Sequence, residues 1–178
     1  GGVRRVISAI RKTPVPGPVT VGALGLDGDE QVDLSVHGGL DKAVYLYPAE
    51  HYPFWETVRG QAGLAGALPH GSLGENLTVS GLLEAQAWVG DRLRIGEVEL
   101  VVTQPRSPCY KFDAHFGFGW ASKMMVQSGY TGFYCAVVRP GKLAAGDRID
   151  VLAGERAVSI EQAHRLKTRR AASRSFLG

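Results

Sequence analysis

Gly96-Glu97-Val98-Glu99-Leu100-Val101-Val102-Thr103 is the stretch of sequence that decides the fold class. Val98, Leu100 and Val102 fall on one face of an extended chain, which is the period-two pattern of a strand with one buried side. The Gly-Glu pair before them suits a hairpin turn. We therefore expect a strand over 98–103 that is the second arm of a hairpin.

Short extended runs of the same character recur along the chain, bounded by Gly, Pro and Asp: 3–10, 43–47, 76–79, 92–96, 133–138 and 148–152. The strand-helix alternation of a doubly wound sheet is missing. Many short strands with glycine-rich turns and few helices favour a mainly β fold in a closed or nearly closed barrel.

Three helices are expected between or after these strands. Residues 49–59 place Tyr52, Trp55 and Val58 at helical spacing, and 120–127 form a second segment. A third helix is expected to begin at Ser159, because Ser159 and Gln162 make an S-x-x-Q capping box. If this helix packs on the barrel, Ala163 and Leu166 are its expected buried face.

Composition limits the class of protein. The 178 residues are 44% hydrophobic and 21% charged, which is typical of one ordinary folded domain. No apolar run is long enough to cross a bilayer, and 1–12 carries charges where a secretory leader needs apolar residues. Two cysteines cannot build a disulfide scaffold. We expect a cytoplasmic protein without a membrane partner.

Positive charge is concentrated in the last part of the sequence, where residues 156–178 hold six Lys and Arg against Glu161 alone. A nucleic-acid-binding domain usually has a basic patch on its folded surface with interleaved aromatic residues, so no nucleic-acid partner is expected. The segment is interpreted either as a solvated helix face or as a docking strip for an acidic protein.

The most unusual stretch is Gln104-Pro105-Arg106-Ser107-Pro108-Cys109-Tyr110-Lys111. Its two prolines are expected to exclude a helix and a central strand, so that Cys109 is held on a stiff loop at a strand end. Arg106 and Lys111 flank the thiol and favour the thiolate, the form that attacks electrophiles or binds a soft metal. Cys135 lies in an apolar run and is expected in the core.

Two further clusters are glycine-rich. His37-Gly38-Gly39 with Lys42 could hold an anion, and Gly71 to Leu77 brings Glu75 and Asn76 to the start of a strand. Each is equally readable as a plain turn. The sequence contains no CxxC, no HExxH and no P-loop, so structural zinc and nucleotide-dependent classes have little support.

These clusters together resemble the MOSC domain, named for the C-terminal domain of molybdenum-cofactor sulfurases, and most of all its stand-alone bacterial YiiM-like branch. The resemblance covers about residues 3–152 and rests on motifs in this order: His37-Gly38-Gly39-x-Asp41-Lys42-Ala43-Val44-Tyr45, Tyr47-Pro48, His51-Tyr52, Trp55, Gly74-Glu75-Asn76-Leu77, Val89-Gly90-Asp91, Gln104-Pro105-Arg106-x-Pro108-Cys109, Gly129-x-x-Gly132 and Pro140-Gly141. It implies a MOSC domain over 1–153 and, over 154–178, the start of a helical module that ends before three helices are complete.

The resemblance implies a pyruvate-kinase-like β-barrel with a few short helices and a C-terminal helical stub. It implies a molybdenum cofactor (molybdopterin) whose metal is bound by Cys109, with His37 or His115 as proton donor. The expected cofactor-binding residues are Arg106, Ser107, Lys111, Lys42, His37, Gly38, Gly39, Asn76 and Glu75.

The activity implied is reduction of N-hydroxylated compounds such as 6-hydroxylaminopurine to the amine and water. The chain has no cysteine cluster for an iron–sulfur centre and no flavin fingerprint, so electrons are expected from a separate flavoprotein or iron–sulfur protein. Two alternatives stay open: a sulfur-transfer protein with a persulfide on Cys109, and a non-catalytic carrier of the cofactor.

Overall fold

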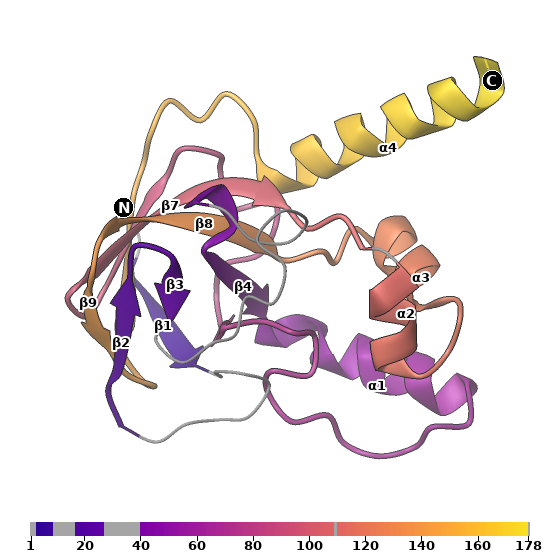
Figure 1. Ribbon diagram of the computed structural model, residues 1–178, viewed down its shortest axis with the longest axis horizontal. Helices are drawn as coiled ribbons and strands as arrows, with labels where there is room; N and C mark the ends of the chain where they lie inside the picture. The colour runs from indigo at the N-terminus through magenta and orange to yellow at the C-terminus, as the bar shows by residue number, and fades with distance from the viewer. Residues whose placement is uncertain (1–2, 9–16, 27–39, 109, 178) are drawn as a thin grey trace.

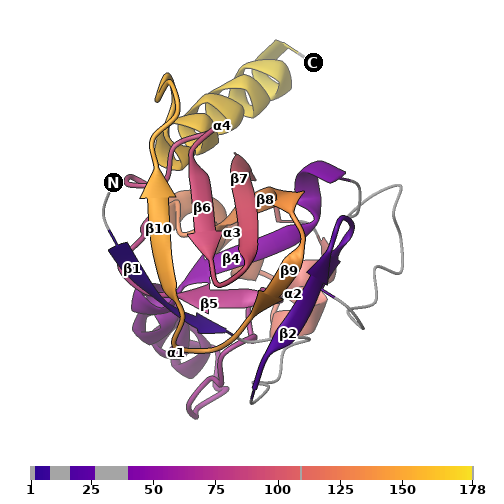
Figure 2. The ribbon, with the colours of Figure 1, turned by 90° about the vertical axis from the view of Figure 1, so that its left-hand side faces the viewer.

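A closed barrel of seven strands forms the body of the computed structural model, which describes residues 3–8, 17–26, 40–108 and 110–177. The barrel strands are β1 (Val3–Ser8), β4 (Val44–Pro48), β5 (Leu77–Val79), β6 (Arg92–Ile95), β7 (Val98–Pro105), β8 (Phe133–Arg139) and β10 (Arg148–Leu152). Their order is β1-β10-β6-β7-β8-β4-β5, and β5 pairs with β1 to close the ring (Figure 2). The expected barrel of mainly β structure is confirmed.

The 96–97 turn joins β6 and β7 as an antiparallel hairpin in which Ile95 pairs with Val98. Gly96 has a φ of 57°, and a Cβ at this position would lie 2.7 Å from the Lys142 carbonyl oxygen, so only glycine fits. Val98, Leu100 and Val102 are all buried, as their alternation predicts. β4 and β5 pair in parallel across a helical connection, although the other barrel pairs are antiparallel.

A small sheet and the helices surround this barrel (Figure 1). The sheet has the order β3-β2-β9, with β2 at Val19–Gly22, β3 at Gly25–Leu26 and β9 at Gly141–Leu143. The helical segments are η1 (Leu40–Lys42), η2 (Ala49–His51), α1 (Tyr52–Gln61), α2 (Tyr110–Phe116), α3 (Ala121–Ser128) and α4 (Ile160–Leu177). The small sheet and α2 were not expected from the sequence.

Two apolar clusters hold the molecule together. Side chains of β4, β5, β6, β7, β8 and β10, Cys135 among them, form most of one cluster, and burial raises the pKa of the Cys135 thiol. The second cluster joins α1, α2 and α3 to β4, with Trp55 fully buried at its centre. The helical face of Tyr52, Trp55 and Val58 is therefore the one that packs inward.

The proline-rich stretch differs from the expectation in one respect. β7 continues through Gln104 to Pro105, which pairs with Phe133, so the first proline does not exclude a central strand. Pro105 is the last residue of β7 and follows an irregular register at Val102/Gln104, a position where proline is tolerated.

The last helix, α4, is capped as predicted. Gln162 N–H donates to Ser159 Oγ at 3.1 Å, and Ser159 N–H donates to Gln162 Oε1 at 3.0 Å. Leu166 is 50% exposed, so it is not the buried face of α4; Ile160 and His164 are buried instead. The rest of α4 projects away from the barrel (Figure 1). In the described part of the chain, no helix combines the length and apolar character needed to span a membrane.

Candidate functional site

Arg106 lies where the end of β7, the 71–75 loop, β4 and α2 meet. Its Nη1 donates to the Leu73 carbonyl oxygen at 2.5 Å. The guanidinium carbon lies 5.1 Å from the centre of the Tyr45 ring and 4.9 Å from that of Phe112, which are cation–π distances. Arg106 is half-buried, and these contacts fix its plane at the point where the chain leaves the barrel towards residue 109.

The 71–75 loop is shaped by glycines and tied to α1. Gly71 and Gly74 have φ values of 92° and 84°, and Gly74 N–H donates to the Gly71 carbonyl at 3.0 Å in a tight turn. The Gly71 N–H donates at 3.0 Å to the Tyr52 hydroxyl, which in turn donates to Glu75 Oε2 at 2.6 Å. The loop is therefore held rigidly beside Arg106.

Glu75 and Asn76 hold this loop from inside. The Glu75 carboxylate also accepts hydrogen bonds from Leu73 N–H at 3.1 Å and Thr78 Oγ1 at 3.0 Å. Burial raises the pKa of Glu75 in spite of its donors, which favour the charged form. Asn76 Oδ1 accepts from Tyr45 N–H at 2.7 Å, so it fastens the loop to β4. These contacts give both residues a positioning role.

Lys42 lies on the other side of a pair of tyrosine rings, Tyr45 and Tyr134, which we call the tyrosine pair. The ring centres of the pair are 5.0 Å apart, and Lys42 Nζ lies 5.7 Å from the centre of the Tyr134 ring. Arg106 contacts the other ring, so the pair connects two cations from distant parts of the sequence. Burial raises the pKa of the Tyr45 hydroxyl, which therefore stays protonated and donates to the Thr131 carbonyl at 2.5 Å.

Lys42 also has a cationic neighbour on α4. Burial lowers the pKa of Lys167, and the positive charge of Lys42 lowers it further. The first turns of α4 thus bring basic charge towards the same side of the barrel as Lys42. No sequence signal connected these two residues.

His115 is exposed on α2, and its Nε2 lies 3.0 Å from the Ser72 carbonyl oxygen. It therefore contacts the residue next to the one that Arg106 contacts. Ser107 and Lys111 are exposed. His37, Gly38, Gly39 and Cys109 lie outside the described residues.

The structure thus brings Arg106, His115, Glu75 and Asn76 to one loop and connects Lys42 to them through the tyrosine pair. Sequence reasoning quoted Tyr45 only as the end of a motif and missed Tyr134 and Phe112, because an aromatic residue in a strand or helix is indistinguishable from ordinary core until its neighbours are known. In the described part of the chain, no three His, Cys, Asp or Glu side chains are grouped so that they could hold a metal ion.

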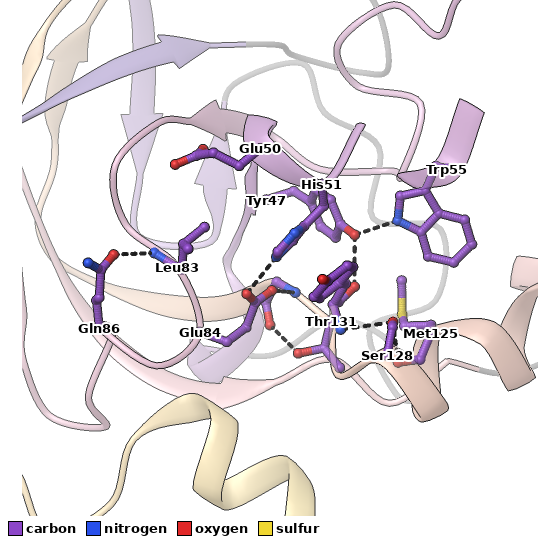
Figure 3. Close-up of polar contacts among 12 residues, drawn as sticks. Tyr47, Glu50, His51, Trp55, Leu83, Glu84, Gln86, Met125, Ser128 and Thr131 are labelled. Carbon is purple, nitrogen blue, oxygen red and sulfur yellow. Dashed lines mark hydrogen bonds and ion pairs between the residues drawn. The ribbon is translucent and has the colours of Figure 1, made fainter. Parts of the chain in front are cut away.

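A second polar network lies between η2 and the start of β8 (Figure 3). His51 Nε2 and Glu84 Oε1 are 2.7 Å apart, and both side chains are buried. Glu84 Oε2 accepts from Gly132 N–H at 2.9 Å, and the His51 ring stacks on Tyr130 with centres 3.8 Å apart. This network borders a cavity of about 350 Å³ beside α3 and α4. His51 belongs to a motif noted in the sequence, whereas nothing marked Glu84.

The chain is similar to known proteins over most of its length. A model of the MOSC domain matches residues 33–150. Protein YflK of Bacillus subtilis (strain 168) is 40% identical over 164 residues, which cover 92% of this chain and 72% of YflK. Protein YiiM of Escherichia coli (strain K12) is 38% identical over 88% of this chain and 69% of its own length.

A solved structure and a longer relative are also similar to this chain. The crystal structure of E. coli YiiM superposes with a TM-score of 0.80 at 32% identity, over 93% of this chain and 77% of that one. A protein of Gibberella moniliformis (strain M3125 / FGSC 7600) named "Reductase" is 34% identical to this chain. The match covers 83% of this chain and 26% of the Gibberella protein.

Proposed function

The chain belongs to the MOSC domain family, and from that premise we propose that it uses a molybdenum cofactor to reduce N-hydroxylated compounds such as 6-hydroxylaminopurine. The observation that carries the proposal is the convergence of Arg106, Lys42 and the 71–75 loop around the tyrosine pair, next to the start of the segment that holds Cys109. The name "Reductase" of the Gibberella moniliformis relative supports the reaction class.

The residues present fit such a cofactor. Cys109 offers one thiolate, a ligand that suits a soft metal. Arg106 and Lys42 provide positive charge beside the tyrosine pair for the phosphate of an organic ligand. When bound, the cofactor supplies two-electron redox chemistry and most of the ligands of its metal. The protein's own part is to bind the group, to orient it and to deliver protons.

Each protein group has a proposed task. Cys109 binds the metal. Arg106, whose plane is fixed by Leu73 and two aromatic rings, presents a planar donor to the phosphate, and Lys42 presents a point charge. Ser107, Lys111, His37, Gly38 and Gly39 complete the binding set, while Glu75 and Asn76 hold the loop in place behind it.

The reaction consumes two electrons and two protons, and it converts an N–OH group into N–H and water. The protons come from His115, which lies on the rim beside Ser72, or from His37. The electrons come from a separate flavoprotein or iron–sulfur protein. The exposed arginines of α4 give this donor a positively charged surface to dock on.

Molybdenum content and 6-hydroxylaminopurine reduction, measured on one preparation from a molybdenum-replete host with a reduced dye as electron donor, test the proposal. We expect both in the wild type, neither in Cys109→Ser, and both in Cys135→Ser at lower stability, because that change puts a hydroxyl into the core. Bound molybdenum without turnover would make the protein a cofactor carrier. A persulfide on Cys109 without molybdenum would make it a sulfur-transfer protein.

A further inference from the structure

We propose that a small pocket beside His115 binds an acidic group of the substrate, so that N-hydroxylated compounds carrying a phosphate or carboxylate are preferred over neutral ones; this rests on the proposed reductase function. The pocket has a volume of about 190 Å³ and is lined by Arg59, Leu68, Ser72, His115 and Phe116. No motif of the sequence pointed to it.

The pocket shares a wall with the candidate site. Ser72 lines it, and the next residue, Leu73, accepts the hydrogen bond of Arg106. His115 lines it as well, and its ring is fixed by the contact with the Ser72 carbonyl. A molecule whose acidic end occupies the pocket therefore lies beside Ser72 and His115, next to the loop that Arg106 contacts.

Arg59 is the group that makes the pocket selective for acids. It is half-buried in the last turn of α1, and its guanidinium has no ion pair with any residue of the described part. Glu56 lies one turn earlier on the same helix, yet it does not pair with Arg59. A planar guanidinium beside a pocket is suited to bidentate contact with a phosphate or carboxylate.

Size and lining restrict what the pocket can take. Its 190 Å³ correspond to roughly six water molecules, so it holds an acidic group with its first attached atoms but not a whole nucleotide. Phe116 is buried and Leu68 is half-buried, so part of the wall is apolar. An apolar wall lowers the local dielectric constant and strengthens the attraction between Arg59 and an anion.

A purely structural role for Arg59 makes a different prediction. A cation in the last turn of a helix stabilises the helix slightly by interacting with its dipole, whatever the substrate. In that case Arg59→Ala changes thermal stability slightly and leaves substrate preference as it was. The two roles are therefore separated by comparing charged and neutral substrates.

The test compares three related substrates: 6-hydroxylaminopurine, its riboside and its riboside 5′-monophosphate. In the wild-type holoenzyme we expect the lowest KM for the monophosphate. Arg59→Ala is expected to raise that KM about ten- to a hundredfold with little change in kcat, because a charge-assisted contact is lost. The KM of the two neutral substrates stays the same. Arg59→Lys recovers part of the preference.

Arg148→Ala is the matched control, because Arg148 is an exposed arginine on β10 that does not line the pocket. The pair benzamidoxime and 4-carboxybenzamidoxime repeats the comparison with a carboxylate in place of the phosphate. A preference for one acid alone identifies which of the two the pocket takes. Added salt is expected to erode the preference in the wild type only.

Equal KM values for neutral and charged substrates in the wild type, or the same preference in Arg59→Ala, would overturn the inference. Titration calorimetry with the monophosphate on the same preparations separates it from the reductase proposal. If the wild type binds the monophosphate and Arg59→Ala does not, while no substrate is reduced, the acid pocket stands and the reductase is wrong.

Discussion

Arg106 and Leu73 are 33 residues apart in the chain, and the guanidinium of the first donates to the backbone carbonyl of the second at 2.5 Å. This contact ties the end of β7 to the 71–75 loop. Arg106, which is proposed to bind the cofactor, thus also stabilises the fold. Its two roles can be separated by a comparison with Lys42, whose ammonium group lies over the face of the Tyr134 ring.

Arg106→Ala and Lys42→Ala are both expected to lower cofactor content by roughly ten- to a hundredfold at limiting cofactor, because each removes a charged contact to the phosphate. Only Arg106→Ala should also lower the free energy of unfolding, by about 1 kcal/mol, since the hydrogen bond to Leu73 is lost. Pterin analysis and denaturant unfolding on the apo and loaded proteins measure the two effects. Unchanged pterin content in both variants would place the phosphate elsewhere.

The buried pair of His51 and Glu84 is expected to matter for stability more than for the reaction. Glu84→Ala leaves the His51 imidazole and the Gly132 N–H without their partner, which costs roughly 3 kcal/mol and lowers Tm by about 6–12 °C. Glu50→Ala is the control, because Glu50 accepts one hydrogen bond from Gly81 N–H in an exposed position. Equal Tm shifts in the two variants would contradict the importance of this network.

The raised pKa of Glu75 is expected to make the protein less stable as pH rises. Because burial raises its pKa above the ordinary 4.5, the folded protein keeps this proton to a higher pH than the unfolded chain does. The free energy of unfolding therefore falls as pH rises from about 4.5 through the pKa of the folded state. Glu75→Gln removes this slope. Denaturant unfolding of both proteins between about pH 4 and 8 measures this slope. Parallel curves for the two proteins would refute the prediction.

The exposed half of α4 is expected to bind the electron donor. Replacing Arg169, Arg170 and Arg174 with Ala should raise the apparent KM for an acidic protein donor and reduce its salt dependence, while turnover with a small dye stays unchanged. Substitution is a cleaner test than deletion of the helix, because deletion would also remove the buried Ile160 and His164.

The matched control for α4 is Arg139→Ala with Lys142→Ala and Arg148→Ala, which likewise removes three positive charges, here at exposed positions of β8, β9 and β10. If this control raises the KM for the protein donor as much as the α4 variant does, docking is governed by total charge and the helix is not the docking surface. If dye turnover falls together with Tm in the α4 variant, the arginines are structural.

The sequence predicted the elements whose local pattern agrees with their tertiary surroundings. The alternation of Val98, Leu100 and Val102 and the capping box of Ser159 and Gln162 are of this kind, because burial of one face and pairing of backbone groups leave marks within a few residues. β2 and β9 were missed because each of these short strands contains a glycine, a residue that is more typical of turns than of strands. α2 was missed because its aromatic residues are poor helix formers and no cap precedes them.

The candidate site was predictable only in part for a related reason. Arg106 and Lys42 could be proposed from the sequence because they are charged and lie in recognisable motifs. The tyrosine pair between them depends on the pairing of β4 with β8, which the sequence does not show. Glu75 was expected to face the cofactor, whereas its carboxylate bonds to Tyr52, Leu73 and Thr78 within the fold. Side-chain direction at the end of a loop is set by tertiary contacts that no short motif records.

The pairing of β1 with β10 has a consequence for how the protein is made on the ribosome. β1 is synthesised early, and its partner Arg148–Leu152 leaves the ribosome roughly ten to thirty seconds later at ordinary translation speeds. Until then the facing edges of β1 and β6 have no neighbour, and open edges of this kind invite pairing with other chains. The nascent polypeptide is therefore most prone to aggregation just before its barrel closes, and substitutions that weaken β10 will reduce the yield of folded protein more than the activity of the molecules that do fold.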